Sequence, residues 1–268
     1  MFKRMFTNYR YSRIRGRIVK DLGNDVVADR QEIAPGFDQQ AMEKATITLI
    51  GAGGINSEVG EGLVRKRVGC LKILDPDEVS RSNLNRQFYF TRDLYKSKGL
   101  RLPRNLAKHS TRGTLLFGYD LSFQDAIMLK ADISCHIVIC GVDNNPTRVD
   151  VSKYYRALGI PVLFLAVDRV AESGYCFVQE SCSESACFGC AFPSCMNNTK
   201  VPCRTPAVKD VLKIVAGMCL YGVDSLLMDR ARNWNYRNLH VAGYAPSNSM
   251  IIEKNMECPL CGKGRKEQ

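Results

Sequence analysis

The sequence predicts an α/β fold: a Rossmann-like, doubly wound, mainly parallel sheet, followed by antiparallel strands near the C-terminus. Short runs rich in β-branched residues alternate with longer stretches of helical periodicity, which is typical of strand–helix–strand units. The first apolar run, residues 45–50, leads directly into the glycine cluster Gly51-Ala-Gly-Gly54 and then into a helical pattern from Ser57 to Val64. This order of strand, glycine turn and helix indicates a phosphate-binding turn.

The glycine turn departs from the full dinucleotide-binding pattern at one position. That pattern has a third glycine, and Asn56 stands in its place. A helix start of this kind aims free backbone N–H groups at a phosphate, so the expected ligand is a nucleotide. The alternative is a tight strand–helix turn that binds no ligand.

Polar side chains follow the second predicted strand, residues 71–74. Asp75 ends this strand about 20 residues after the glycines, where an acidic side chain binds a ribose; the alternative is a plain strand-end carboxylate. In the next polar segment, Asn83 and Arg86 are placed to reach phosphate oxygens. Lys98 opens a basic stretch that we expect to form a helix through Ala107. The alternative for these three residues is ordinary surface polarity.

A third apolar run, residues 136–141, is a buried strand that leads into Asp143. This carboxylate lies at the carboxyl end of a strand and is a candidate Mg²⁺ ligand, or else a helix cap or turn residue. A helix over 146–158 and a strand over 161–165 complete a second unit. Further on, the pattern predicts a helix over 207–230 with an apolar core face, and strands over 234–244 and 249–253.

Cysteine spacing indicates a metal site. Two CxxC pairs suit the four corners of a tetrahedral zinc site, which would be structural because no ligand position is open. Twelve cysteines without a signal peptide argue for a reducing, cytoplasmic compartment. Cys182 and Cys195 are nearby competitors as ligands, and a redox role for the pairs is the alternative. The four expected ligands are Cys187, Cys190, Cys258 and Cys261.

A further cysteine, Cys203, lies in a polar, proline-bounded loop between Lys200 and Arg204, just before a predicted helix. Cations and a helix N-terminus both favour the thiolate, which is the nucleophilic form. Cys203 is therefore either a nucleophile or an ordinary loop cysteine.

The bulk properties restrict the class of protein. The 268 residues carry a net charge of +11, which suits anionic partners. The basic residues are scattered without interleaved aromatics, so nucleic-acid binding is not expected, and no apolar run is long enough to span a membrane. Residues 1–43 form a polar, basic N-terminal arm, in which we expect a short helix around residues 10–14.

In their order and content these features resemble the ThiF/MoeB-type adenylyltransferase superfamily, which includes the activating enzymes of ubiquitin-like proteins. The resemblance runs from Arg10 to Cys261, and its most specific part is the segment 75–87, DPDEVSRSNLNRQ, followed by Asp143-Asn144. It implies a dimer-contacting arm over 1–43 and an adenylation domain over 44–268. It implies the following ligand contacts. The ATP phosphates would be bound by Gly51, Gly53, Gly54, Asn83, Arg86 and Lys98. The ribose would be bound by Asp75, and Mg²⁺ by Asp143.

The resemblance also implies a homodimer. The segment Arg10-Tyr-Ser-Arg13 is similar to an N-terminal motif whose second arginine enters the partner subunit's active site, so Arg13 is a candidate arginine finger. Cys203, in a loop over 194–206, is similar to the acceptor cysteine of ThiF and of compact activating enzymes. The spacing from Arg86 to Lys98 is slightly short for the family, which makes Lys96 a second candidate for that lysine.

The function implied is ATP-dependent adenylation of the C-terminal glycine of a ubiquitin-like protein, followed by a thioester on Cys203 and transfer to a conjugating enzyme. Within the same superfamily the alternative is a sulfur-carrier adenylyltransferase without thioester transfer. Outside it, the alternatives are a nicotinamide-dependent oxidoreductase that uses the glycine turn and an inactive nucleotide-binding scaffold.

Overall fold

The computed structural model describes residues 9–21, 26–196, 206–228 and 230–262. Its strands are β1 (Tyr11–Arg15), β2 (Thr46–Ile50), β3 (Cys70–Leu74), β4 (Leu115–Tyr119), β5 (Ile137–Cys140), β6 (Val162–Val167), β7 (Ser173–Gln179), β8 (Tyr236–His240) and β9 (Asn248–Met250). Its α-helices are α1 (Asp29–Glu32), α2 (Gln39–Lys44), α3 (Gly54–Arg65), α4 (Lys98–Leu106), α5 (Phe123–Met128), α6 (Asn145–Ala157), α7 (Phe188–Ala191) and α8 (Lys209–Leu227).

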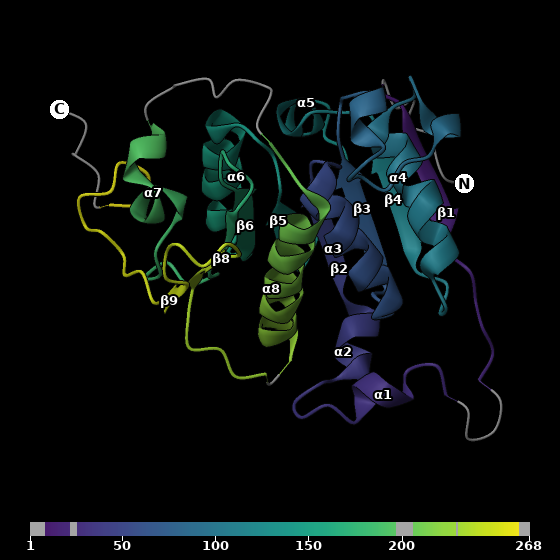
Figure 1. Cartoon of the computed structure of the whole chain (residues 1–268), viewed down its shortest axis with the longest axis horizontal. Coiled ribbons are helices and arrows are strands. Elements are labelled where there is room, and N and C mark those ends of the chain that lie inside the picture. The colour runs from purple at the N-terminus through teal and green to yellow at the C-terminus, as the bar shows by residue number, and fades with distance from the viewer. Residues whose placement is uncertain (1–8, 22–25, 197–205, 229, 263–268) are drawn as a thin grey trace.

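The described strands form one sheet in the order β1-β4-β3-β2-β5-β6-β7-β8-β9 (Figure 1). The central strands from β4 to β6 are parallel, whereas β1 and the β7–β9 end pair antiparallel to their neighbours. The predicted fold class, a mainly parallel sheet with antiparallel C-terminal strands, is confirmed. No helix among the described residues is long and apolar enough to cross a bilayer.

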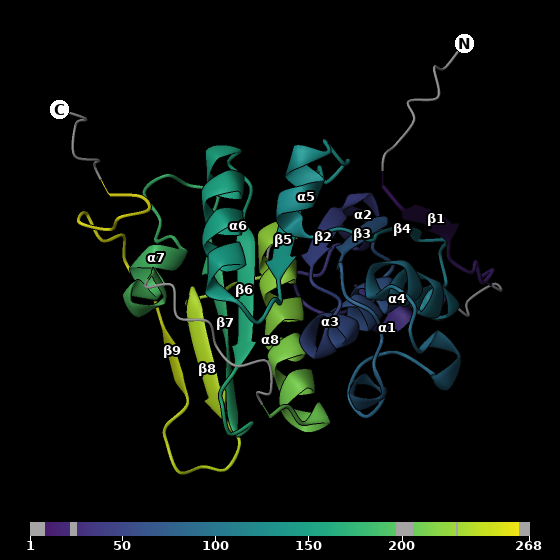
Figure 2. The same cartoon turned by 90° about the horizontal axis from the view of Figure 1, so that it is seen from above.

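Helices cover both faces of this sheet, as Figure 2 shows: α5 and α6 lie on one side, and α3, α4 and α8 lie on the other. Two apolar cores result. One packs α3, α4 and α8 on residues such as Leu49 and Ile73. The other packs α5 and α6 on residues such as Val138 and Phe164. Because both faces are covered, the central strands consist mainly of apolar residues on both faces; the buried Lys72 of β3 is an exception.

Strands that follow β2 in the sequence are added to the sheet on both of its sides. After β2 the chain forms β3 on one side, and it later forms β5 on the other, with Ile50 paired to Leu74 and to Cys140. The carboxyl ends of the three strands therefore meet at one edge of the sheet, the position at which open α/β sheets bind ligands, and we call this edge the crevice.

The prediction of a helix around residues 10–14 was wrong, because these residues form β1. This strand pairs with β4 in the register Tyr11 to Tyr119. In β1, exposed side chains alternate with the half-buried side chains of Ser12 and Ile14, and Ile14 packs on the core. Residues 11–15 are extended because they pair with a strand about 100 residues away. Local propensity contains no information on such a distant pairing. Strands β4 and β7 were not predicted, and the C-terminal strands are shorter than expected.

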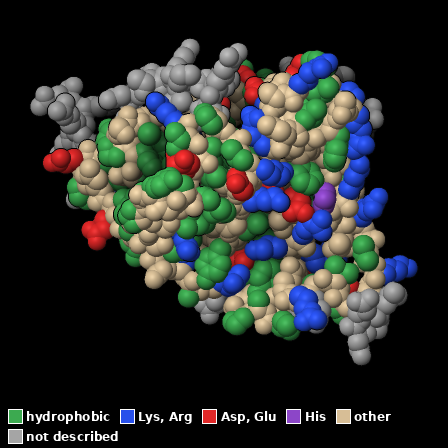
Figure 3. Space-filling model, in the orientation of Figure 1, with side chains coloured by type: hydrophobic (Ala, Val, Ile, Leu, Met, Phe, Trp, Pro, Cys, Tyr) green, Lys and Arg blue, Asp and Glu red, His purple; other side chains and the backbone are tan. Residues whose placement is uncertain are grey.

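On the face that Figure 3 shows, the positive charge is unevenly spread. Lys and Arg side chains gather on the side of the molecule that carries α4 and β1 (Figure 3). Exposed Arg13 and Arg15 lie on β1, and exposed Arg104 lies on α4. Such a concentration of positive charge favours the approach of an anionic partner.

Candidate active site

The glycine turn joins β2 to α3 and leaves the helix start open to a ligand. Gly51 has φ +91°, a conformation that favours glycine, and its N–H donates to the carbonyl of Leu74 at 2.8 Å. Gly53 is the N-cap of α3 and makes no side-chain cap hydrogen bond. The N–H groups in the first turn of this 12-residue helix are therefore available to an anion.

Asn56 does not disrupt the turn. Its side chain is fully buried, and Nδ2 donates to the carbonyls of Ile50 at 2.9 Å and Gly51 at 2.8 Å. An amide thus ties together the end of β2 and the first residue of the turn, at the position where the dinucleotide pattern has a glycine.

Asp75, at the end of β3, holds the same turn from the other side. Asp75 is 6% exposed, and its carboxylate accepts hydrogen bonds from the N–H groups of Ala52 at 2.6 Å and Asp77 at 2.8 Å. Burial raises the pKa of Asp75 to about 6, although the nearby Lys98 ammonium lowers it. A carboxylate with two oxygens retains lone pairs for further donors such as ribose hydroxyls.

Lys98 lies beside this carboxylate. It is buried at the start of α4, and its Nζ donates to Asp77 Oδ2 at 2.9 Å. Lys96 instead is exposed and donates to the carbonyl of Arg92 at 2.7 Å. Of the two candidate lysines, Lys98 is the one that the structure brings to the crevice.

The polar segment after β3 is fastened to the glycine turn. Tyr89 is buried, and its hydroxyl donates to the carbonyl of Ala52 at 2.8 Å. Asn83 is also buried and accepts a hydrogen bond from the N–H of Ser80 at 2.9 Å, which fixes the segment's own turn. Arg86 is half-buried and donates to Asn85 Oδ1 at 3.0 Å.

Asp143 follows β5 and is exposed. The helix cap beside it is Asn144, whose side chain accepts from the N–H of Thr147 at 2.9 Å. Asp143 is therefore not the N-cap, and its carboxylate faces solvent beside the crevice. An exposed carboxylate on a strand end fits the oxygen-donor preference of Mg²⁺.

Arg148 is a residue that the sequence reasoning missed. It is 8% exposed, and its guanidinium donates to the carbonyl of Val142 at 2.6 Å and to Asn145 Oδ1 at 3.0 Å, on either side of Asp143. The sequence does contain a signal for this residue. Arg148 precedes Val151 by three residues, so both lie on the core-facing side of α6. Asp77 and Tyr89 were missed as well, because their partners are distant in sequence.

Of the remaining predicted site residues, Arg13 lies away from the crevice and Cys203 is not among the described residues. Arg13 lies on the edge strand β1, with its guanidinium 5.7 Å from the centre of the Phe117 ring. Cys203 lies outside the described residues, as does most of the loop 194–206. The helix that follows this loop does reach the glycine turn, because a Cβ on Gly54 would lie 2.5 Å from Leu212 of α8.

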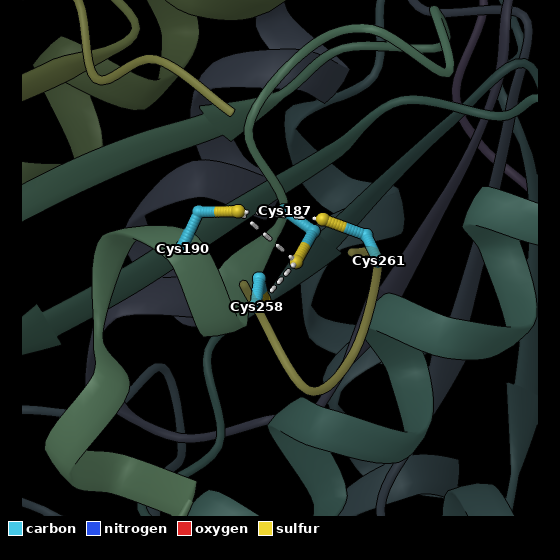
Figure 4. Close-up of side chains that lie close together, drawn as sticks. All are labelled: Cys187, Cys190, Cys258 and Cys261. Atoms are coloured by element: carbon cyan, nitrogen blue, oxygen red, sulfur yellow. Dashed lines mark hydrogen bonds between the residues drawn. The ribbon is translucent and has the colours of Figure 1, made fainter. Parts of the chain in front are cut away.

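The four predicted zinc ligands converge. Figure 4 shows the side chains of Cys187 and Cys190, from the α7 end, facing those of Cys258 and Cys261 from the C-terminal turn. All four Sγ atoms lie within 4.8 Å of one another. Three of the sulfur–sulfur distances are 3.8 Å for Cys187–Cys190, 3.6 Å for Cys187–Cys258 and 3.3 Å for Cys190–Cys261.

These sulfur separations fit a zinc ion. Four sulfurs at tetrahedral Zn–S distances lie about 3.8 Å apart. Burial opposes the thiolate at Cys190, but the backbone N–H of Asn255, 3.3 Å from Sγ, helps to lower the pKa of this thiol to about 7. The cluster is consistent with a structural zinc site. The competitors Cys182 and Cys195 are not members of it.

A protein-family model described as "ThiF family" matches residues 26–260. The chain belongs to the ThiF family. This membership leaves the nicotinamide-dependent oxidoreductase interpretation without support and agrees with the predicted resemblance.

Relatives in this family carry names of two kinds. The chain is 27% identical over 231 residues to the sulfur carrier protein adenylyltransferase of Thermus thermophilus, covering 84% of each chain. It is 24% identical over 230 residues to the SAMP-activating enzyme E1 of Haloferax volcanii, covering 84% of this chain and 83% of that protein. It is also 24% identical to ubiquitin-like modifier-activating enzyme 5 of Oryza sativa subsp. japonica, covering 93% of this chain and 66% of that protein.

Solved structures show the same fold. The crystal structure of E. coli MccB with ATP has a TM-score of 0.68 to this chain at 18% sequence identity, covering 84% of this chain and 68% of that one. At this identity the likeness concerns the fold alone.

Proposed function

We propose that this protein uses ATP to adenylate the C-terminal carboxylate of a small ubiquitin-like or sulfur-carrier protein. The observation that carries the proposal is the meeting of the glycine turn, Asp75 and Asp143 at the carboxyl ends of β2, β3 and β5, in a chain of the ThiF family. The names of the relatives, a sulfur carrier protein adenylyltransferase and a SAMP-activating enzyme, support this substrate class.

The reaction needs positioning and charge neutralisation more than covalent help from the protein. A carboxylate oxygen of the partner's last residue attacks the α-phosphorus of ATP, the bond to the bridging oxygen breaks, and pyrophosphate leaves. In our proposal the first turn of α3 binds the phosphates, Asp75 accepts from the ribose, and Arg86 and Lys98 neutralise charge at the α-phosphorus. Asp143 would hold Mg²⁺, which would further neutralise the charge of the phosphates.

Lys98 is held ready for this role by Asp77. The 2.9 Å contact with Asp77 Oδ2 holds the Lys98 ammonium where its charge also acts on Asp75. A triphosphate carries more negative charge than one carboxylate, so the ammonium is expected to turn towards it when ATP binds. Asp77 is 68% exposed at its side chain, so its carboxylate is readily solvated when the lysine leaves.

Cys203 is proposed to accept the acyl group after adenylation. Its thiolate attacks the acyl carbon of the adenylate, a thioester forms, and AMP leaves with the bonding electron pair. The contact between Leu212 and Gly54 brings the start of α8 against the nucleotide turn, and Cys203 precedes Val208, the N-cap of this helix, by five residues. Such a segment spans up to about 17 Å. A conjugating enzyme would then receive the acyl group.

A sulfur-carrier adenylyltransferase is the second candidate. The match to the Thermus thermophilus protein favours it, since that relative bears this name and is covered over 84% of its length. The two candidates share the adenylation step and differ in the fate of the adenylate. A thioester on Cys203 distinguishes them.

Arg13 is proposed to act in a partner subunit. It lies on the edge strand β1, and β4 and β3 separate it from β2 within its own sheet. An exposed arginine on an edge is free to complete a second copy's site, and a homodimer would complete both sites by symmetry.

The test is ATP–pyrophosphate exchange with a panel of glycine-ended ubiquitin-like and sulfur-carrier proteins, followed by non-reducing gels. We expect exchange with at least one partner, its loss in Asp143→Ala, and its retention in Asp150→Ala, which removes an exposed carboxylate from α6. A thiol-sensitive adduct that Cys203→Ala abolishes supports the thioester step, and exchange without it supports the sulfur-carrier candidate. Wild-type exchange in Asp143→Ala would refute the assignment of this carboxylate.

A further inference from the structure

Asn56 occupies the first turn of α3 and is 0% exposed. Its Nδ2 reaches two consecutive carbonyls, that of Ile50 at 2.9 Å and that of Gly51 at 2.8 Å. Ile50 is the last residue of β2, and Gly51 is the residue whose φ of +91° starts the turn. The amide therefore fixes the orientation of the peptide groups from which the turn departs.

The same side chain faces the end of β5. A Cβ built on Gly141 would lie 2.5 Å from Asn56 Oδ1 and 2.7 Å from its Cγ, which is closer than real atoms approach. Gly141 follows β5 directly, donates its N–H to the carbonyl of Ile50 at 3.0 Å, and precedes Asp143 by two residues. Asn56 thus touches both halves of the crevice, the phosphate turn and the strand end that carries Asp143.

The need for a glycine at position 141 comes from this contact. Gly141 is not among the glycines with positive φ, so its backbone conformation is one that other residues adopt readily. What a larger residue would meet there is the carboxamide of Asn56. An asparagine in place of the dinucleotide pattern's third glycine is therefore accommodated by a glycine on the neighbouring strand end.

This arrangement carries a cost that glycine at position 56 would avoid. Asn56 Oδ1 is buried and has no hydrogen-bond partner within the described chain. A buried acceptor without a partner is unfavourable. The two hydrogen bonds that Nδ2 donates offset that cost, and both of their acceptors lie where the turn begins.

We propose that Asn56 is a positioning residue for the nucleotide: its amide holds the glycine turn in its ligand-binding shape, and Gly141 is a glycine because Asn56 fills the space beside it. The role of Asn56 towards ATP rests on the proposed adenylation function, whereas its pairing with Gly141 does not. The peptide it orients leads to Ala52, whose N–H donates to Asp75 and whose carbonyl accepts from Tyr89.

The pairing is tested by a double-mutant cycle on thermal unfolding, which requires no substrate. Gly141→Ala is expected to lower the Tm by roughly 2–4 °C in the wild-type background and by less than half as much in the Asn56→Gly background. Equal losses in both backgrounds would refute the pairing.

The positioning role is tested with Asn56→Asp, which keeps the shape and loses the donor, against Asn233→Asp as an exposed control. We expect a KM for ATP at least about 10-fold higher in pyrophosphate exchange, with kcat within about twofold. Because a buried carboxylate can unfold a domain, Asn56→Gly is the second variant, and the same KM shift is expected. An unchanged KM in a folded Asn56→Gly protein would overturn the role.

These measurements separate the two proposals. If the wild-type protein neither binds ATP nor exchanges pyrophosphate with any partner, the proposed function fails and the positioning role fails with it. The Tm cycle still decides whether Asn56 and Gly141 are paired. If the wild-type protein is active and Asn56→Gly matches it in KM, only the positioning role fails.

Discussion

The carboxylate of Asp75 accepts a 2.6 Å hydrogen bond from the backbone N–H of Ala52, so the end of β3 directly supports the turn that follows β2. The hydroxyl of Tyr89 binds the carbonyl of the same residue at 2.8 Å. Both polar groups of Ala52 are therefore held by side chains that flank the crevice. A ligand that binds at this turn meets a backbone fixed before it arrives.

The buried Asp75 should give the protein a characteristic pH dependence. Burial raises the pKa of Asp75 from 3.8 to about 6, so between these values the folded chain holds a proton that the unfolded chain releases. The contribution of this group to the free energy of unfolding therefore falls as the pH rises from about 4 to 6, by about 3 kcal/mol at most, and is constant above.

Chemical unfolding of the wild type and Asp75→Asn across this range measures the effect. The free energy of unfolding of the wild type, relative to that of the variant, should fall as the pH rises through this range and then level off. ATP binding should weaken in the wild type below about pH 6, since a protonated carboxyl accepts fewer hydrogen bonds. A difference between the two proteins that is flat from pH 4 to 7 would contradict the raised pKa.

Lys98 and Lys96 are the two candidates for the lysine that neutralises charge at the α-phosphorus, so each serves as the control for the other. Lys98 lies beside Asp77 and Asp75, whereas Lys96 points to the surface carbonyl of Arg92. We expect Lys98→Ala to lower kcat for pyrophosphate exchange by about 100-fold or more, as for the loss of one transition-state donor. Lys96→Ala should stay within about twofold. The reverse ranking would transfer the role to Lys96.

The cysteine cluster should contribute stability through zinc. Cys258→Ser is expected to lower the bound zinc from about one ion per chain and to lower the Tm, because the C-terminal turn would lose its attachment to α7. Metal analysis and calorimetry on the same preparations measure both. Cys182→Ser is the control, as Cys182 is exposed and outside the cluster. Full stability in a metal-free Cys258→Ser protein would refute a structural zinc.

Arg13 should act in trans if the protein is a homodimer. Arg13→Ala and Asp143→Ala should each be inactive in exchange assays. Mixed and allowed to exchange subunits, the two variants should recover about a quarter of wild-type activity, because half the dimers are mixed and each has one complete site. Size-exclusion chromatography with light scattering provides the oligomeric state. No recovery from a mixture shown to form mixed dimers would place Arg13 outside the active site.

The parts of the fold that were predicted from the sequence are those set by local patterns. Strands β2, β3 and β5 are buried on both faces and are therefore mainly apolar runs, interrupted only by Thr46 and Thr48 in β2 and by Lys72 in β3, and the glycines after β2 identify the turn. The cysteine cluster followed from two CxxC pairs, because the spacing itself suits a metal. The helix α4 was predicted from its start at Lys98.

What was not predicted depends on contacts between distant residues. Residues 11–15 became a strand only because β4 pairs with them. The contact of Lys98 with Asp77 and that of Asn56 with Gly141 join segments whose relative placement no local pattern reports. Asn56 was recognised only as a departure from a glycine pattern, and the neighbouring strand end supplied the reason that the fold accepts it.

The central claim is that the protein places AMP on the C-terminal carboxylate of a partner protein. The most direct measurement is intact-mass spectrometry of glycine-ended partners after incubation with the protein, ATP and Mg²⁺, with fragmentation to locate the modified residue. Our account predicts an AMP adduct on the last residue of one partner, absent with Asp143→Ala. AMP on an internal side chain, or an adduct that persists with Asp143→Ala, would contradict it.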